Sequence, residues 1–291
     1  MNAIRITELT KYYGKARGIK DVDLTVEKGD LFGFIGPNGA GKSTTIRILL
    51  GLINATSGNA EIFGKNIISS KQEILSGIGY LPSESMFYNG MKVKDIIKFS
   101  ADLRKKNCGD EAKKLCERLQ LDVTKKVDEL SLGNRKKVAI VCAMQHKPEL
   151  YIMDEPTSGL DPLMQREFFE LLKERNSEGA TIFLSSHVLS EIQRYCNRAA
   201  IIREGRIIKS DTVANLSKSY AKRVTLHGVD AFPQIEGMRD VYQLAESISF
   251  LYSGDIQALM QEIAKHKPDD LTIAEPDLEE IFMHFYTEGA E

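Results

Sequence analysis

The sequence predicts a three-layer α/β domain on a mixed, mainly parallel sheet, followed by a smaller α+β domain. Up to about residue 211, strand-like apolar patterns alternate with helical spacing, which is typical of a parallel sheet covered by helices. A glycine-rich turn also joins one of these strands to the helix after it. The length of 291 residues suits one large domain and one small one.

The first strands differ in their expected burial. Residues 4–9 and 22–26 alternate apolar and polar side chains, which predicts half-buried strands. Residues 31–35 are an almost unbroken apolar run, which predicts a strand buried on both faces. This run leads into a glycine-rich segment at 36–44, and residues 44–52 then have helical spacing. A phosphate-binding loop requires this order of strand, glycine-rich turn and helix.

The middle of the chain is predicted to be a helical insertion subdomain at about residues 84–147. Between Arg104 and Lys137 there are 11 Lys and Arg against 6 Asp and Glu, a local net charge of +5. A solvated helical face is the favoured interpretation of this basic stretch. A surface near anionic lipid headgroups is the alternative.

Strands and helices alternate again after this insertion. Strand patterns occur at 150–156, 181–187 and 199–208, and helical patterns at 163–176 and 188–196. These elements complete a first domain predicted at residues 1–211.

Residues 212–291 are predicted to form the small α+β domain. The expected elements are strands at 223–229 and 247–255 and an amphipathic helix at 256–266. Asp277, followed three residues later by Glu280, has the capping-box pattern that predicts one last helix.

Composition disfavours several classes of protein. The chain has 39 Lys and Arg against 41 Asp and Glu, a net charge of -2, so a dedicated nucleic-acid binder is not expected. No apolar run approaches the ~20 residues of a membrane-spanning helix, and no secretory signal pattern is expected at the N-terminus. The cysteines lack CxxC pairing and metal-ligand spacing, which suits reduced thiols in a cytosolic protein: Cys108, Cys116, Cys142 and Cys196.

Residues 36–43 match the phosphate-binding pattern GxxxxGK[ST] in full. Its glycines let backbone N–H groups converge on phosphate oxygens at a helix N-terminus. Lys42 is expected to reach the β- and γ-phosphates of ATP, and Ser43 to bind Mg²⁺. A glycine-rich turn without a ligand is the alternative, and the full match in its strand-to-helix context disfavours it. The predicted nucleotide contacts are Gly36, Pro37, Asn38, Gly39, Ala40, Gly41, Lys42, Ser43 and Thr44.

In the strand pattern at 150–156, two adjacent carboxylates follow the four mainly apolar residues 150–153. Asp154 and Glu155 then lie at the carboxyl end of a strand, where ligands gather in open α/β sheets. Asp154 is expected to bind Mg²⁺ through water and Ser43, and Glu155 to take the proton of the attacking water. An ordinary exposed pair of acids is the alternative, but hydrolysis beside a phosphate loop needs both of these groups.

Five motifs in chain order resemble those of the ATP-binding subunits of ABC transporters. They are the two phosphate-site motifs, LSLGN at 130–134, SGLD at 158–161, which resembles the family's D-loop, and SSH at 185–187, which resembles its switch histidine. KYYGK precedes them. The resemblance covers about residues 3–210 and implies a P-loop NTPase core. It also implies that Tyr13 stacks on adenine and that Asp161 belongs to the nucleotide site. His187 would contact the γ-phosphate and orient water beside Glu155.

The resemblance further implies that two such domains meet head to tail with two ATP molecules between them. Each ATP would contact Lys42 and Ser43 of one copy, and Ser131 and Gly133 of the other. Amides at the start of a helix predicted over 134–146 are suited to cap a γ-phosphate. ATP would then close the interface and hydrolysis would open it. The second subunit would be another copy or a paralogous ATPase.

The LSLGN signature and a final helix resembling DLEEIF are more like drug or peptide-antibiotic exporters than like importers. Their membrane subunits are separate chains, which implies a separately encoded permease and a location on the cytoplasmic face of the cell membrane. An importer ATPase is the nearest alternative. An ABC ATPase acting on nucleic acid or ribosomes is disfavoured because there is a single site and no long coiled coil. A regulator without hydrolysis would lack Glu155 or His187.

Two positions depart from the family pattern. GYLP at 79–82 is followed by Ser83 and Glu84, where the family often has a glutamine that contacts Mg²⁺ and senses the membrane subunit. Glu84 or a water is expected to replace that contact, because Ser83 is short. Leu132 and Asn134 also depart from LSGGQ, and Leu132 is expected to face away from the nucleotide.

Overall fold

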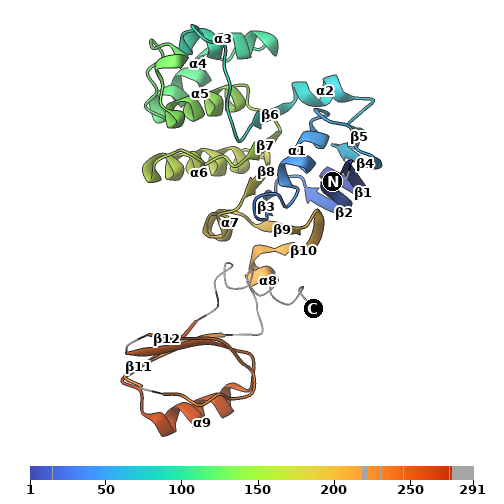
Figure 1. Cartoon of the computed structure of the whole chain (residues 1–291). Coiled ribbons are helices and arrows are strands. Elements are labelled where there is room, and N and C mark those ends of the chain that lie inside the picture. The colour runs from blue at the N-terminus through green and yellow to red at the C-terminus, as the bar shows by residue number, and fades with distance from the viewer. Residues whose placement is uncertain (15, 218–221, 230, 245, 275, 277–291) are drawn as a thin grey trace. The chain divides into compact units, whose positions relative to one another are not determined.

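The computed structural model describes residues 1–14, 16–217, 222–229, 231–244, 246–274 and 276 (Figure 1). The chain divides into two compact units, Met1–Asp211 and Thr212–Glu291. The main apolar core of the first unit draws its side chains from residues 4 to 202. The core of the second unit draws them from residues 224 to 263. Each unit therefore has a core of its own.

The main sheet of the first unit has six strands within the described residues, in the order β10-β9-β3-β8-β7-β6. They are β3 (Leu31–Ile35), β6 (Ile78–Leu81), β7 (Leu150–Asp154), β8 (Thr181–Ser186), β9 (Arg198–Arg203) and β10 (Arg206–Thr212). β3 pairs in parallel with β8 and β9, and β7 pairs in parallel with β8 and β6. Every residue of β3, β7 and β8 is buried, as apolar runs predict for strands covered on both faces.

A second, antiparallel sheet has the order β2-β1-β4-β5. Its strands are β1 (Asn2–Tyr13), β2 (Ala16–Glu27), β4 (Ser57–Ile62) and β5 (Lys65–Asn66). The predicted half-buried strands at 4–9 and 22–26 lie here, as β1 and β2. β1 alternates buried and exposed positions because one face of this sheet packs on the core.

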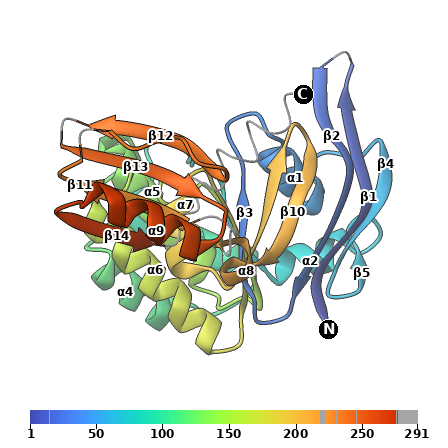
Figure 2. The same cartoon turned by 90° about the horizontal axis from the view of Figure 1, so that it is seen from below.

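Helix α1 (Lys42–Leu49) lies between the two sheets (Figure 2). Its Ile46 and Leu49 share one core cluster with β1 and β3. The opposite face of the main sheet is covered by α6 (Pro162–Ser177) and α7 (Leu189–Tyr195). This arrangement of helices on both faces of a mainly parallel sheet confirms the predicted fold class.

The segment between β6 and β7 contains three α-helices, all within the described residues. They are α3 (Val93–Leu103), α4 (Gly109–Arg118) and α5 (Leu132–Met144), with a short 3₁₀ turn at Val127–Glu129 before α5. α3 and α4 both pack against α5. Residues 84–92, expected to begin the helical region, contain no helix. A further short helix, α2 (Lys71–Ser76), precedes β6.

The second unit is an antiparallel sheet with one long helix. The sheet has the order β12-β13-β11-β14. Its strands are β11 (Lys222–His227), β12 (Met238–Leu244), β13 (Ser247–Tyr252) and β14 (Asp270–Ala274). α9 (Ile256–His266) covers one face through Leu259 and Ile263, and α8 (Val213–Ser217) precedes the sheet. The helix expected after Asp277 lies outside the described residues.

One predicted strand is wrong as a single element. The pattern at 199–208 is divided between β9 and β10 by a turn at Glu204 and Gly205, which have φ angles of 53° and 76°. Glycine adopts such angles without steric cost, so the chain reverses inside an otherwise apolar run.

Candidate functional site

The glycine-rich loop connects the end of β3 at Ile35 to the start of α1 at Lys42. Two of its glycines have no room for a side chain. A Cβ on Gly36 would lie 2.5 Å from the Ile202 carbonyl oxygen, and one on Gly41 would lie 2.6 Å from the Ile19 side chain. Gly41 also has a φ of 112°, which L side chains rarely adopt. The loop therefore depends on glycine for both its conformation and its close approach to β9 and β2.

A cavity of about 280 Å³ opens over this loop. Its walls are Gly18, Pro37, Asn38, Gly39, Gly41, Lys42, Ser43, Thr44, Ser83 and Glu155. Seven of the nine predicted loop contacts are thus in the wall. Gly36 and Ala40 lie behind it, where Ala40 is buried and its amide donates to the Pro37 carbonyl at 3.1 Å.

Lys42 is almost fully buried, with 6% of its surface exposed. Its Nζ donates to the carbonyls of Gly36 and Pro37 at 2.5 and 3.2 Å. The same Nζ lies 3.2 Å from Glu155 Oε1. These three oxygen neighbours fix the position of the buried ammonium. Its positive charge can then attract another anionic oxygen, such as that of a phosphate.

Asp154 and Glu155 are positioned by a serine on the neighbouring strand. β7 and β8 run in parallel, and Asp154 is opposite Ser185. Ser185 Oγ donates to Asp154 Oδ1 at 2.6 Å and accepts from the Glu155 amide at 3.2 Å. Glu155 has a φ of 46°, an uncommon angle for a residue with a side chain. Such backbone geometry clusters at functional sites, where neighbouring contacts hold it.

Glu155 also contacts the predicted switch histidine. His187 Nδ1 lies 2.8 Å from Glu155 Oε2, and 53% of the His187 side chain is exposed. The two oxygens of Glu155 therefore face different cations or donors, Lys42 on one side and His187 on the other. Three residues that the sequence places in three separate motifs come together here.

The site offers oxygen ligands of the kind that Mg²⁺ prefers. Ser43 lies in the cavity wall, and Asp154 lies at the strand end with 2% of its surface exposed. Within the described residues no group of three or more His, Cys, Asp or Glu is arranged to hold a metal ion. Mg²⁺ is commonly bound by one or two protein oxygens together with substrate phosphates, so this ligand set fits it.

The signature and D-loop residues do not line this cavity. Ser131 is exposed and caps α5, where its Oγ accepts from the Asn134 amide at 3.4 Å. A Cβ on Gly133 would lie 2.6 Å from the Gly159 carbonyl oxygen, so the two motifs touch within one chain. Asp161 caps α6 and accepts from the Met164 amide at 3.0 Å.

Tyr13 and the loop after β6 border the cavity in different ways. Tyr13 is half-exposed and lies close to Gly18, because a Cβ on Gly18 would be 3.2 Å from its ring. Gly18 is part of the cavity wall. Ser83 also lies in the wall, whereas Glu84 is exposed outside it. Leu132 is 68% exposed.

Two contacts that support the site were not predicted from the sequence: that of Ser185, whose SSH motif was singled out for His187, and that of Lys136. Lys136 on α5 is 3% exposed, and its Nζ donates to the carbonyls of Pro82 and Ser83, both at 3.0 Å. Burial lowers the pKa of Lys136 to about 8, against the opposing influence of the Asp154 and Glu155 carboxylates. In the sequence Lys136 is one of three consecutive basic residues, which is typical of a solvated face.

Comparison with known proteins places this geometry in a family. Residues 19–158 match the family described as ABC transporter. The bacitracin transport ATP-binding protein BcrA of Bacillus licheniformis is 42% identical over 226 residues, which cover 75% of this chain and 72% of that protein. The chain belongs to the ABC transporter family. The linearmycin resistance ATP-binding protein LnrL of Bacillus subtilis is 30% identical over 97% of both chains.

Solved structures agree with this assignment. The ATP-binding subunit of an ABC transporter superposes with a TM-score of 0.71 at 29% identity, covering 74% of this chain and 92% of that one. The ADP conformation of MJ1267, an ATP-binding cassette of an ABC transporter, gives a TM-score of 0.63 at 25% identity, covering 74% and 94%. The chain is thus the ATP-binding subunit of an ABC transporter and an ATPase. None of its described helices is long and apolar enough to cross a membrane.

Proposed function

We propose that this ATPase powers export through a separately encoded permease, by ATP-driven head-to-tail dimerisation on the cytoplasmic face of the cell membrane. The observation that carries the proposal is the contact of Glu155 with both Lys42 and His187 at the wall of the phosphate-loop cavity. The relatives named for bacitracin transport and linearmycin resistance support the export direction.

Hydrolysis begins with an exchange of partners at Lys42. The β- and γ-phosphates of ATP take the Lys42 ammonium, which lies 3.2 Å from Glu155 in this structure. Glu155 is then free to accept the proton of the attacking water. His187, 2.8 Å from the other Glu155 oxygen, orients that water and contacts the γ-phosphate. Ser43 and Asp154 hold Mg²⁺, which neutralises charge on the phosphates when it is bound.

The site is completed by a second subunit, either another copy or a paralogous ATPase. Ser131 and Gly133 lie outside the cavity of their own chain, and Ser131 is exposed at the N-terminus of the 13-residue α5. A helix N-terminus attracts phosphate through its free amides and its dipole. These residues therefore meet the γ-phosphate bound by the partner. Tyr13, near the wall residue Gly18, stacks on the adenine, and Asp161 lines the interface.

A permease needs a surface on which to dock. The segment after Ser83 and the adjoining α3 expose large apolar side chains: Met86, Tyr88, Phe99 and Leu103. The rings of Tyr88 and Phe99 are 6.4 Å apart in an edge-on arrangement. Exposed apolar groups gathered in one segment are typical of an interface. In this proposal residues 1–211 form the nucleotide-binding domain, with its helical subdomain at about 84–147, and residues 212–291 form a small accessory domain. The protein as a whole is proposed to have no nucleic-acid partner.

The decisive experiment uses Glu155→Gln, which keeps the side-chain shape and removes the base. This variant should hydrolyse ATP at least a hundredfold more slowly while it still binds ATP, and with MgATP it should elute as a stable dimer in size exclusion with light scattering. Glu170→Gln, on an exposed face of α6, is the matched control and should behave as the parent. Hydrolysis by Glu155→Gln at the parent rate would exclude Glu155 as the base.

Affinity capture of the full chain from native membranes should bring down the permease.

A further inference from the structure

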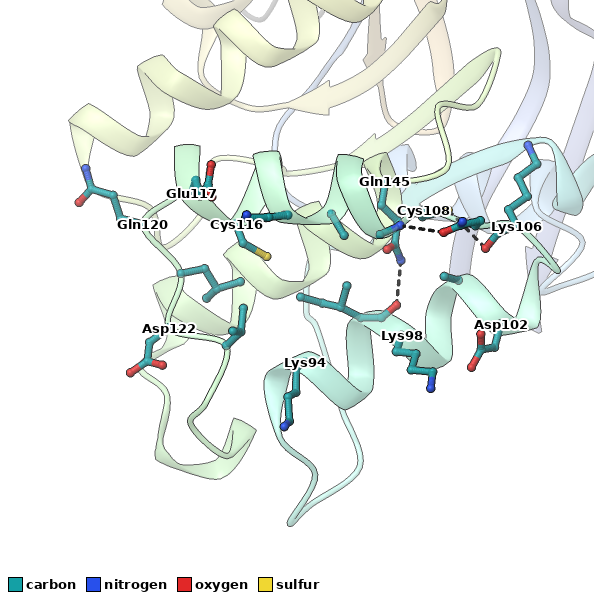
Figure 3. A pocket seen from close by; sticks show the side chains of 18 of the residues that line it. Lys94, Lys98, Asp102, Lys106, Cys108, Cys116, Glu117, Gln120, Asp122 and Gln145 are labelled. Atoms are coloured by element: carbon teal, nitrogen blue, oxygen red, sulfur yellow. Dashed lines mark hydrogen bonds between the residues drawn. The ribbon is translucent and has the colours of Figure 1, made fainter.

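A cavity of about 1200 Å³ lies in the helical region, away from the predicted nucleotide residues. It is bounded by α3, by α4 with the loops on either side of it, and by Gln145 after α5 (Figure 3). α3 and α4 each pack on α5, and the cavity occupies the space between them. We call it the α3–α4 groove.

The floor of the groove is apolar and made largely of small side chains. Ile97, Ala101, Ala112, Cys116 and Leu121 line it and are all buried. In Figure 3 the Cys116 sulfur points into the open space between the helices. Small residues on facing helices leave a slot that the protein's own side chains do not fill, which costs packing energy unless another molecule occupies it.

One polar group at the end of the floor has an unpaired atom. Gln145 is 2% exposed, and its Nε2 donates to the Ile97 carbonyl at 3.0 Å. Its Oε1 is buried and has no hydrogen-bond partner among the described residues. A buried acceptor of this kind needs a donor, which a water at the end of the floor can supply.

The rim of the groove is basic. Its lysines outnumber its carboxylates by five to three: Lys94, Lys98, Lys105, Lys106 and Lys113 against Asp102, Glu117 and Asp122. None of these five lysines forms an ion pair within the part of the chain that the structure describes, and Lys106 donates a hydrogen bond to the His146 carbonyl at 3.5 Å. These ammonium groups are therefore available to an anionic ligand.

We propose that the α3–α4 groove binds an anionic membrane phospholipid, with an acyl chain on the floor and the phosphate among the rim lysines. An apolar slot beside unpaired ammonium groups matches a molecule with a hydrocarbon chain and a negative head. The floor, which combines Ile97 and Leu121 with three smaller apolar residues, has room for a methylene chain. The inference rests on the proposed location at a membrane, where such lipids are abundant.

The first test measures binding of the full chain to vesicles. Phosphatidylcholine vesicles containing phosphatidylglycerol should bind it, and pure phosphatidylcholine vesicles should not. Lys98→Glu with Lys113→Glu should weaken binding at least tenfold. The matched control is Lys114→Glu with Lys125→Glu, which makes the same charge change in the same region at lysines outside the groove. Equal losses in the two pairs would reduce the effect to general surface charge and overturn the proposal.

The second test fills the floor without changing charge. Ala112→Phe should remove binding of soluble dihexanoyl phosphatidylglycerol, measured by calorimetry, and dihexanoyl phosphatidylcholine should not bind the parent. The proposal would be overturned by unchanged binding to Ala112→Phe or by equal binding of both lipids. It would also be overturned if inorganic phosphate or a poly-glutamate peptide competed as strongly as the lipid. ATP hydrolysis without lipid reports folding of every variant. It should stay at the parent rate, so a negative lipid result leaves the proposed ATPase mechanism standing.

Discussion

At the scale of single residues, Glu155 connects more parts of the site than any other side chain described above. Its backbone amide is held by Ser185, and its two carboxylate oxygens face Lys42 and His187. The ion pair with Lys42 and the contact with His187 hold the carboxylate from two sides, while Ser185 holds the backbone. A general base needs such a fixed position in order to meet a water at one defined point. A change in any of these partners should therefore act on hydrolysis through Glu155.

Lys42→Ala tests the role of Lys42, which forms an ion pair with Glu155. The substitution removes the ammonium that is expected to meet the β- and γ-phosphates, so ATP affinity should fall at least tenfold, or about 1.4 kcal/mol. Titration with a fluorescent ATP analogue measures it. Lys28→Ala removes an exposed lysine that pairs with Glu149 and serves as the control. Unchanged affinity in Lys42→Ala would contradict the phosphate-loop assignment.

Residues whose chemistry follows from a local motif could be predicted from the sequence. Contacts that depend on tertiary structure could not. Lys42 and Glu155 each belong to a short pattern with a recognisable strand before it. Ser185 acts on Asp154 only because β7 and β8 pair in parallel, and this contact joins residues 31 positions apart. Lys136 reaches a loop 53 positions away. No local spacing carries that information.

At the scale of elements, burial decided what could be predicted. β3, β7 and β8 are fully buried and were visible as apolar runs. The helix expected at 256–266 has those bounds as α9, because its amphipathic stripe faces the second core. β5 and β14 have mostly exposed or half-exposed positions and were missed. A strand held by backbone pairing on an open sheet edge leaves little apolar pattern to read.

Lys136 gives a prediction for the contact between α5 and the loop after β6. Lys136→Met leaves two partly buried carbonyls without their donor, which should cost roughly 1–3 kcal/mol in the free energy of unfolding. Because Ser83 lies in the cavity wall, the turnover number for ATP should fall more than the apparent ATP affinity. Urea denaturation and steady-state kinetics measure the two effects. Lys125→Met, at an exposed lysine, should change neither. Equal losses of affinity and turnover would point to general unfolding.

His146 predicts how the helical region responds to acid. It is 5% exposed and contacts the Ile78 carbonyl at 3.2 Å, and burial lowers the pKa of His146 to about 4, with the charge of Arg104 adding to the effect. The unfolded chain takes up this proton near pH 6.5, whereas the folded chain does so near pH 4. Stability should therefore fall as the pH drops from 6.5 to 4, by up to about 1.4 kcal/mol per pH unit, and His146 should have no effect above pH 7.

The comparison variant is His146→Gln, which keeps a donor for the Ile78 carbonyl and cannot titrate. Urea denaturation of both proteins at pH 5 and pH 7.5 should show a smaller acid loss in the variant. If both proteins lose the same free energy of unfolding between these two pH values, other groups must carry the acid sensitivity.

At the scale of the whole molecule, the cavity is assembled from distant parts of one unit, and in the proposed function a second chain completes the site. The cavity wall includes residues from Gly18 to Glu155, and the order β3-β8-β7 brings the phosphate loop and the carboxylates to the same end of the sheet. Ser131 and Gly133 stay outside that wall although they lie in the same unit. The motif of Ser131 and Gly133 assigns them to a nucleotide site, but in the monomer they lie outside it. This difference supports a site shared with a partner chain.

Ser131→Arg separates ATP binding by one chain from the ATP-driven dimerisation of two chains. Ser131 is exposed, and its loss as a cap on α5 should cost about 1 kcal/mol or less, since its bond to the Asn134 amide is long at 3.4 Å. The arginine side chain would project into the space where the partner's γ-phosphate is expected. In a Glu155→Gln background it should abolish the dimer formed with MgATP, while the monomer binds ATP within about twofold of the parent. Ser177→Arg, an exposed serine at the end of α6, is the control that should still dimerise. Loss of ATP binding together with dimerisation would argue that Ser131 serves its own chain, and the composite site would then have to be abandoned.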